Sequence, residues 1–453
     1  MPTVSDKSKY KRSLSMKTAG IIAEYNPFHN GHKYHLDEVR RQTGADYLII
    51  VMSGDFTQRG IPAVIDKYSR TRMALAAGAD LVLELPVCYA TGSAAWFAEG
   101  AVSLLSSLGC VDLVSFGSEC GDIDRLTAIA KILSEEPPAF TEMLKCCLKE
   151  GLSYPAAREK ALQAAFSVTA SQEKTLQSAL SVPAAQEKSL QAALSAPNDI
   201  LGVEYCKALF EQKSTITPHT ISRLGGAYDD PDLQAQNSSA LAIRTALYSG
   251  DSAMHDRPAD ALIAIRDQVP PHVYDILSAK LNRTFPVFPD MLSAQLHYKL
   301  ISEADQGFDT YFDVSADLSN RIRKMLPDYR NFTQFCDLLK TKQLTHTRVS
   351  RSLMHILLDI HKIEMEDFRN AGTVFYARML GFRKSSAPLL SAIKDHSRIP
   401  LLSKLADAPS LLTDTGKCQL NRDIRAAHIY QSTVQHAFGT ALPQEQCHEI
   451  ISI

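Results

Sequence analysis

The sequence predicts an α/β fold, in which a Rossmann-like doubly wound parallel sheet is followed by a mostly α-helical C-terminal domain. Short apolar runs at 20–23, 47–52, 81–85 and 113–116 are typical of buried parallel strands. Helical patterns at 31–43, 66–77 and 93–108 separate these runs. Strands that alternate with helices of this length indicate right-handed βαβ units. From about residue 252 onward the pattern is mostly helical, with prolines at the turns.

Three segments follow from this pattern. Residues 1–15 are polar and basic and precede Met16, so we expect a disordered or non-native tail. Residues 16–250 should form the α/β domain, and residues 251–453 the helical domain. A fourteen-residue repeat, Leu-Gln-(Ala/Ser)-Ala-(Phe/Leu)-Ser, interrupts the first domain at about 156–197. Prolines within it predict short helices rather than one rod, and we assign this insertion no chemistry.

Composition excludes several classes of protein. The net charge of the 453 residues is −2, so any contact with nucleic acid must come from a local basic patch. No apolar run approaches the roughly 20 residues of a membrane-spanning helix, and the N-terminus lacks the apolar core of a signal peptide. The nine cysteines include no Cys-x-x-Cys pair. We therefore expect a cytoplasmic protein with reduced thiols and with neither a membrane nor a DNA partner.

The first strand leads directly into His29-Asn30-Gly31-His32, at the predicted start of a helix. A helix N-terminus offers unpaired N–H groups and a partial positive charge, and Gly31 would let a ligand approach the backbone. His29 and His32 add donors, either neutral or charged near neutral pH, which makes them the candidate catalytic residues of a nucleotide phosphate site. Surface histidines or a metal site are the alternatives. Because no cysteine or carboxylate stands at ligand spacing, we expect no metal held by the protein.

The other candidates for this site follow predicted strands. Turns at 26–31, 53–60 and 116–119 come at the carboxyl ends of strands, where ligands bind in doubly wound sheets. Arg223 and Arg244 follow strand and turn signals farther along, and guanidinium groups bind phosphates bidentately. A surface ion pair is the alternative for each arginine. Asn198 is typical of a residue that caps the start of a helix.

The block Glu24-Tyr-Asn-Pro-Phe-His-Asn-Gly-His-Lys-Tyr-His35 resembles the N-terminal signature of the tRNA(Met) cytidine acetate ligases, members of the His-x-Gly-His nucleotidyltransferase-like superfamily. Further matching blocks stand in the same order at 53–60, 78–86, 116–119, 197–202, 240–244 and 345–351. One departure is Leu241, where the superfamily usually has a hydroxyl residue. The resemblance implies a nucleotidyltransferase-like sheet and an ATP site lined by Ile22, Ala23, Glu24, Tyr25, Asn26, Pro27, Phe28, His29, Asn30, Gly31, His32, Lys33, Tyr34, His35, Gly117, Asn198 and Arg223.

The resemblance also implies a reaction. ATP would activate acetate to acetyl-adenylate, and N4 of the wobble cytidine of elongator tRNA(Met) would then take the acetyl group. Mg²⁺ would travel with the pyrophosphate. A small-metabolite adenylyltransferase and a non-catalytic RNA-binding protein with a nucleotide fold are the alternatives. The large basic helical half argues against the first, and the intact His29, Gly31 and His32 argue against the second.

An RNA substrate requires a positive surface, and the helical half contains two basic clusters. Eight Lys or Arg residues lie within 320–351 and five within 378–398. For any single residue a solvated helix face is an equally good reading. We expect RNA contacts from Arg348, Arg351, Arg378, Arg383 and Lys384, with Tyr329, Tyr376 and Phe382 stacking on unpaired anticodon bases.

Overall fold

The computed structural model describes residues 16–152, 154–172, 196–223, 233, 238–248 and 258–453. Three of the sequence predictions concern residues outside these ranges. The predicted N-terminal tail, the second and third repeat units and the boundary at 250/251 lie outside the described residues.

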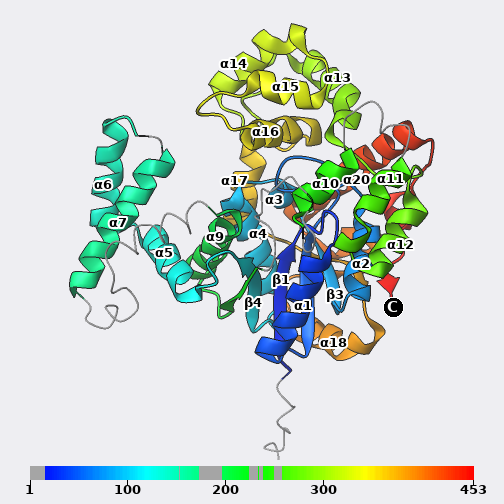
Figure 1. Ribbon diagram of the computed structural model, residues 1–453, viewed down its shortest axis with the longest axis horizontal. Helices are drawn as coiled ribbons and strands as arrows, with labels where there is room; N and C mark the ends of the chain where they lie inside the picture. The colour runs from blue at the N-terminus through cyan, green and yellow to red at the C-terminus, as the bar shows by residue number, and fades with distance from the viewer. Residues whose placement is uncertain (1–15, 153, 173–195, 224–232, 234–237, 249–257) are drawn as a thin grey trace, which may run out of the picture.

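The molecule is organised around one sheet with the strand order β5-β4-β1-β2-β3-β6-β7, and Figure 1 shows β4, β1 and β3 in that order across it. The five N-terminal strands run parallel to one another. They are β1 (Thr18–Ala23), β2 (Tyr47–Ser53), β3 (Leu81–Leu85), β4 (Leu113–Ser118) and β5 (Thr217–Ser222). The predicted doubly wound sheet is therefore confirmed. The strand order reverses between β1 and β4, and such a switch point is where these sheets bind ligands.

Three C-terminal strands extend this sheet. β6 (Ala377–Phe382) pairs antiparallel with β3, while β7 (Leu401–Leu402) and β8 (Ile451–Ser452) run parallel to β6. The expectation that everything after 251 lies in a separate helical domain is wrong for these strands. An arginine at position 378 and a glycine at 381 interrupt the apolar pattern of β6, which is why the sequence did not predict it as a strand.

Alternate residues of the strands build a hydrophobic core on each face of the sheet. In β2, Leu48, Ile50 and Met52 pack on one side, and Ile49 and Val51 pack on the other. The helices that contribute to the first core are α1 (Asn30–Thr43), α2 (Lys67–Ala76), α10 (Ala240–Tyr248), α11 (Pro258–Ala264) and α12 (Pro271–Lys280). The second core includes α3 (Val87–Ala90), α4 (Ala94–Ser107), α5 (Ile123–Glu135) and α9 (Pro197–Glu211).

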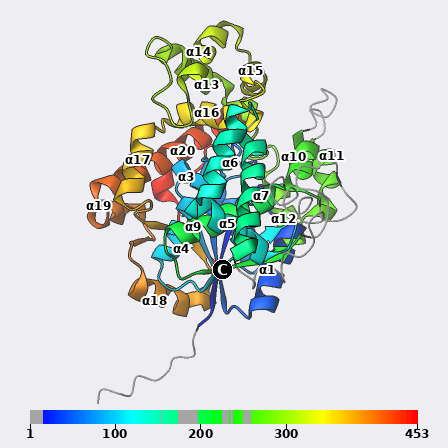
Figure 2. The ribbon, with the colours of Figure 1, turned by 90° about the vertical axis from the view of Figure 1, so that its left-hand side faces the viewer.

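The remaining helices lie around this layered unit. α6 (Pro138–Lys149) and α7 (Tyr154–Gln172) pack on each other and project from one side (Figures 1 and 2). α13 (Ser293–Glu303), α14 (Ala316–Met325), α15 (Phe332–Leu339) and α16 (His346–Leu358) form a group beyond the carboxyl ends of the parallel strands, whereas α18 (Ala387–His396) lies at the opposite end. α17 (Lys362–Ala371), α19 (Ala408–Leu411) and α20 (Asp414–Phe438) complete the C-terminal half.

Short 3-10 turns join several of these helices. They are η2 (Arg266–Gln268), η3 (Pro289–Leu292), η4 (Leu326–Asp328), η5 (Lys384–Ser386), η6 (Leu405–Asp407) and η7 (Glu445–Cys447). None of the helices within the described ranges combines the length and the apolar character that crossing a membrane requires.

Candidate functional site

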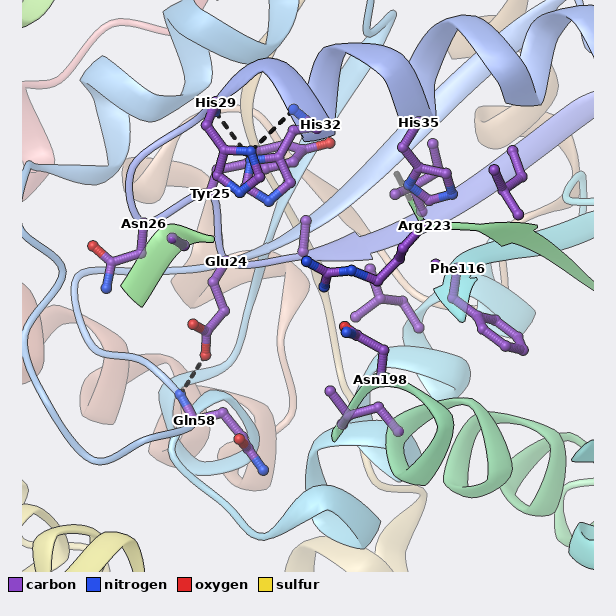
Figure 3. A pocket seen from close by; sticks show the side chains of 18 of the residues that line it. Glu24, Tyr25, Asn26, His29, His32, His35, Gln58, Phe116, Asn198 and Arg223 are labelled. Atoms are coloured by element: carbon purple, nitrogen blue, oxygen red, sulfur yellow. Dashed lines mark hydrogen bonds between the residues drawn. The ribbon is translucent and has the colours of Figure 1, made fainter. Parts of the chain in front are cut away.

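A cavity opens at the carboxyl ends of β1, β4 and β5, at the switch point of the sheet (Figure 3). Residues from β1, the turn after it, α1, α9 and α10 line it together. Thirteen of the residues predicted for a nucleotide site meet there, from segments up to about 200 positions apart. They are Ile22, Ala23, Glu24, Tyr25, Asn26, His29, Gly31, His32, Tyr34, His35, Gly117, Asn198 and Arg223.

Four predicted residues do not line this cavity. Phe28 is fully buried and packs against the ring of Tyr25. The amide of Asn30 donates to the carbonyl of Asp267 at 2.8 Å. Lys33 pairs with a carboxylate one helical turn away, and Pro27 belongs to the turn that leads into α1. These side chains shape the turn and the first helix rather than the wall of the cavity.

His29 and His32 close the N-terminus of α1 with their own rings. Nδ1 of His29 accepts the N–H of Gly31 at 3.1 Å, and Nδ1 of His32 accepts the N–H of His29 at 3.2 Å. The two rings stack with centroids 3.7 Å apart (Figure 3). Because each Nδ1 accepts a hydrogen bond, each neutral ring must carry its proton on Nε2. The pair therefore offers two Nε2–H donors on the ring edges away from the helix backbone.

Gly31 is needed for this arrangement. A Cβ at position 31 would lie 2.9 Å from Cε1 and 3.1 Å from Nδ1 of the His29 ring. The sequence interpretation, that Gly31 admits a ligand, was incomplete, since the glycine first makes room for the imidazole that caps the helix.

The histidines of the cavity are neutral at physiological pH. Removal from water, together with the nearby Arg223 and Arg244, lowers the pKa of His29 to about 3. The pKa of His32 also lies well below its usual value, because of burial and of the neighbouring His29 and Arg223. Burial and the nearby His219 lower the pKa of His35 to about 4. The expectation that either charge state is accessible near neutral pH is therefore wrong for the ligand-free protein.

Two arginines face the same space. The backbone of Arg223 follows β5 and donates to the carbonyl of Ser118 at 3.0 Å, and Figure 3 shows its side chain between the histidine pair and Asn198. Arg244 reaches from α10 and donates to the carbonyl of Asn26 at 2.8 Å. Both side chains line the cavity, and the contact of each with phosphate stays a prediction.

The cavity has two chemically different ends. Arg244 gives one end a positive charge and the neutral imidazoles add N–H donors there, while the other end is formed by the side chains of Phe97, Phe116, Leu201 and Tyr205. The rings of Phe116 and Tyr205 lie 5.5 Å apart. Such a site suits a ligand that joins a flat apolar ring to a polyanionic tail. Sequence reasoning missed Phe97 and Tyr205, because apolar residues on helices carry no signal that separates a ligand site from a core.

The turn at 53–60 forms another part of the wall, and a buried arginine holds it. Arg70 is fully buried and donates to the carbonyl oxygens of Glu24, Ser53 and Gly54. The carboxylate of Glu24 accepts the N–H of Gln58 at 2.8 Å. Gln58 and its neighbour at position 59 then line the cavity. The sequence marked this turn as a strand end but gave no sign of Arg70, which sits inside an ordinary helical pattern.

The same turn connects the cavity to α16. The hydroxyl of Ser350 donates to the carbonyl of Gly60 at 2.8 Å. Gly60 has a φ of +70° and lies against the backbone of Arg351, where a Cβ would collide. Of the two α16 residues expected to bind RNA, Arg348 is exposed, whereas Arg351 donates to Asp313 at 3.2 Å with its side chain 13% exposed.

The second basic cluster does not form a surface beside the cavity. Arg378 is 4% exposed and forms ion pairs with Glu84 and Glu445, so its predicted contact with RNA is wrong. Tyr376 is fully buried and bonds to Asp423, so its predicted stacking on a base is also wrong. The charge pattern misled because buried carboxylates that are distant in sequence neutralise Arg378.

The remaining members of that cluster lie at the far end of the sheet. Phe382, at the end of β6, pairs with Leu81 at the start of β3, so the residues that follow lie opposite the cavity. Arg383 donates to the carbonyl of Leu75 at 2.7 Å, and Lys384 is exposed. Outside this cluster, between α14 and α15, Tyr329 is half-buried and stacks on His297. Contacts of these residues and of Phe382 with RNA stay predictions.

Comparison with known proteins agrees with this geometry. A family model described as HIGH Nucleotidyl Transferase matches residues 16–444. The tRNA(Met) cytidine acetate ligase of Clostridium novyi is 37% identical over 415 residues, covering 92% of this chain and 95% of that protein. The enzyme of the same name from Acetivibrio thermocellus is 38% identical over 416 residues, covering 92% and 94% of the two chains.

Two crystal structures of Thermotoga maritima TmcAL share the fold. The apo form superposes with a TM-score of 0.85 at 32% identity, covering 97% of this chain and all of that one. The form bound with alpha-thio ATP gives a TM-score of 0.81 at 32% identity, covering 96% and 99%. The match of architecture and sequence along nearly the whole length shows that this chain belongs to the tRNA(Met) cytidine acetate ligase family of HIGH nucleotidyl transferases.

Proposed function

We propose that this chain is an ATP-dependent acetate ligase that forms N4-acetylcytidine at the wobble position of elongator tRNA(Met). The observation that carries the proposal is the stacked pair of neutral imidazoles, with their Nε2–H groups beside Arg223, at the switch point of the sheet. The names of the relatives supply the acetate, the cytidine and the tRNA. The relative whose structure was solved with alpha-thio ATP supports binding of a nucleotide by this fold.

In the first step a carboxylate oxygen of acetate attacks the α-phosphorus of ATP, and the bond from that phosphorus to the bridging oxygen breaks. Acetyl-adenylate forms and pyrophosphate leaves. The negative charge that develops on the departing phosphates would be stabilised by the Nε2–H groups of His29 and His32. The guanidinium groups of Arg223 and Arg244 would stabilise the same charge. Acetate is already ionised at neutral pH, so this step needs positioning and electrostatic stabilisation but no general base.

In the second step the N4 amine of cytidine attacks the acetyl carbon of the adenylate. The bond from that carbon to the phosphate oxygen breaks, AMP leaves, and N4 loses one proton. The base must therefore enter the cavity from the protein surface. The turn at 53–60 lines the cavity on one side and contacts α16 on the other, which places the N-terminus of α16 beside a route of entry.

Magnesium fits this site as a companion of the triphosphate. Glu24 is the one acidic side chain among the described residues that line the cavity. No group of three His, Cys, Asp or Glu residues within the described ranges could hold a metal on its own. Mg²⁺ typically binds through one or two carboxylates plus substrate phosphates, and Glu24 could supply such a carboxylate. The ion would neutralise charge on the pyrophosphate.

We further propose that the anticodon docks on the group of helices α14–α16. Their exposed cations outnumber the exposed carboxylates of the same region, and neutralised phosphates supply most of the affinity of such interfaces. Arg348, in the first turn of α16, would lie closest to the entering base because α16 contacts the cavity turn at its neighbour Ser350. The exposed cations are Arg323, Lys324, Arg330, Lys340, Lys342 and Arg348.

The experiment is to incubate the full chain with ATP, labelled acetate and elongator tRNA(Met). The label should enter the tRNA only with ATP, and one AMP should form for each acetyl group. An otherwise identical tRNA with uridine at the wobble position is the matched control and should stay unlabelled. Transfer of AMP to a small metabolite without tRNA acetylation would point to an adenylyltransferase, and tRNA binding without ATP turnover would point to a binding protein.

A further inference from the structure

Two carboxylates join the end of β4 to the start of α9. One lies in α9 and accepts hydrogen bonds from the segment after β4, and the other lies after β4 and accepts hydrogen bonds from α9. Asp199, 1% exposed, accepts hydrogen bonds from the backbone N–H groups of Glu119 at 2.9 Å and of Cys120 at 3.1 Å. Glu119 in turn accepts the N–H of Asp199 at 3.1 Å and Nδ2 of Asn198 at 2.6 Å. α9 begins at Pro197, so the prediction that Asn198 caps it is wrong, and Glu119 does so from outside the helix.

This exchange fixes the amide of Asn198. An ionised carboxylate only accepts hydrogen bonds, so the side of the amide that faces Glu119 must be the NH₂ group. The carbonyl oxygen Oδ1 therefore occupies the other side. Asn198 lines the cavity together with Leu201 and Tyr205 of the same helix, at the end suited to a flat ring. Figure 3 shows the tip of the Asn198 side chain directed toward Arg223.

An amide held in this way presents an acceptor to a nucleobase. Adenine carries a 6-amino group, which donates, whereas guanine carries a 6-oxo group, which accepts. An acceptor on the protein forms a hydrogen bond with the 6-amino group of adenine, whereas it would face a lone pair on the 6-oxo group of guanine. We propose that Glu119 is a positioning residue that orients the Asn198 amide and so selects a 6-aminopurine nucleotide over a 6-oxopurine nucleotide. The inference rests on the proposed use of ATP.

The test measures binding of three nucleotides to the full chain by calorimetry, without acetate or tRNA. ATP and purine riboside triphosphate differ only in the 6-amino group, and GTP carries the opposing 6-oxo group. The wild-type chain should bind ATP about threefold to tenfold tighter than the purine analogue, as one hydrogen bond provides. In Glu119→Gln, whose amide accepts either orientation of Asn198, that ratio should fall toward one, and discrimination against GTP should weaken.

The matched control is Asp122→Asn, which makes the same chemical change three positions away. Asp122 caps α5 through the N–H of Arg125, whereas the side-chain hydrogen bond of Asn198 in the described part of the chain goes to Glu119. This variant should lose some stability and keep the nucleotide ratios of the wild-type chain. If Glu119→Gln does not fold, Asn198→Ala takes its place and should lose the preference for the 6-amino group in the same way.

The outcomes separate this inference from the proposed function. Unchanged nucleotide ratios in a folded Glu119→Gln protein, or in Asn198→Ala, would overturn the inference while ATP binding stands. Failure of the wild-type chain to bind ATP at all would overturn the proposed function as well. Equal losses of selectivity in Glu119→Gln and Asp122→Asn would assign the effect to helix capping in general and also overturn it.

Discussion

Gly31→Ala should lower the turnover that we attribute to the His29–His32 pair while leaving the free energy of unfolding of the protein nearly unchanged. The new methyl group would lie 2.9 Å from Cε1 of His29, so the ring must move. The hydrogen bond from the Gly31 N–H to Nδ1 of His29 and the stack on His32 are then lost. His29 is 6% exposed but lines the cavity, so the space into which its ring can turn is that of the cavity rather than the core.

The effects on folding nearly cancel. Loss of one hydrogen bond costs about 0.5–1.5 kcal/mol. Alanine within a helix is more favourable than glycine by about 1 kcal/mol. The free energy of unfolding should therefore change by less than about 1 kcal/mol. Displacement of one preorganised donor, by contrast, costs about 2.7–4 kcal/mol in the transition state, which corresponds to a fall in turnover of about 100-fold to 1000-fold.

The assay is acetate-dependent release of pyrophosphate, measured beside urea unfolding. The matched control is Gly44→Ala at the other end of the same helix, where φ is +66° and nothing in the described part of the chain would crowd an added Cβ within 4 Å. A left-handed alanine there should cost about 1–2 kcal/mol of stability and leave turnover unchanged. Wild-type turnover in a folded Gly31→Ala protein would refute the role of the stacked imidazoles.

Three further changes test other parts of the structure. Arg348→Glu should weaken binding of tRNA in a filter assay and leave acetyl-adenylate formation intact, whereas the same change at Lys384, at the far end of the sheet, should have the smaller effect; equal effects would contradict the proposed docking face. Arg378→Ala should lower the free energy of unfolding by about 3–5 kcal/mol, because it leaves the buried Glu84 and Glu445 with Lys67 as their shared cation, and an unchanged urea midpoint would contradict this. Because the pKa of His35 falls to about 4 on folding, the unfolded chain binds a proton first, and stability should drop as pH falls from about 6.5 to 4. His35→Asn should show a shallower drop in urea unfolding, and an identical slope would exclude this contribution.

The sequence predicts most of the parallel sheet because its strands are local signals. A strand covered by helices on both faces is apolar at nearly every position, and the runs from 47 to 52 and from 81 to 85 match β2 and β3 closely. β6 escapes this rule because Arg378 is neutralised inside the sheet by Glu84 and Glu445, which stand 294 and 67 positions away. The sequence around position 378 gives no indication that distant glutamates will pair with this arginine.

The residues of the site also fall into those encoded by a local motif and those that depend on distant partners. His29, Gly31 and His32 stand within four positions, and the geometry that they form is encoded in that spacing. Arg70 holds the carbonyl of Glu24 from 46 positions away, and Glu119 holds Asn198 from 79. A sequence shows residues that contact a ligand when they form a compact motif. It does not show residues that hold those contacts in place, because their types are ordinary and their partners are brought together only by the fold.

The architecture explains how two successive transfers can share one cavity. The imidazoles proposed to bind the phosphates also cap the helix that carries them, so their orientation is set by the backbone before any ligand arrives. The turn at 53–60 is fastened to the end of β1 through Arg70 and to α16 through Ser350. A cytidine delivered along α16 would thus meet a wall that is rigidly connected to the strand beneath the nucleotide. Acetyl-adenylate need not leave the cavity to meet its acceptor, and water has less opportunity to hydrolyse it.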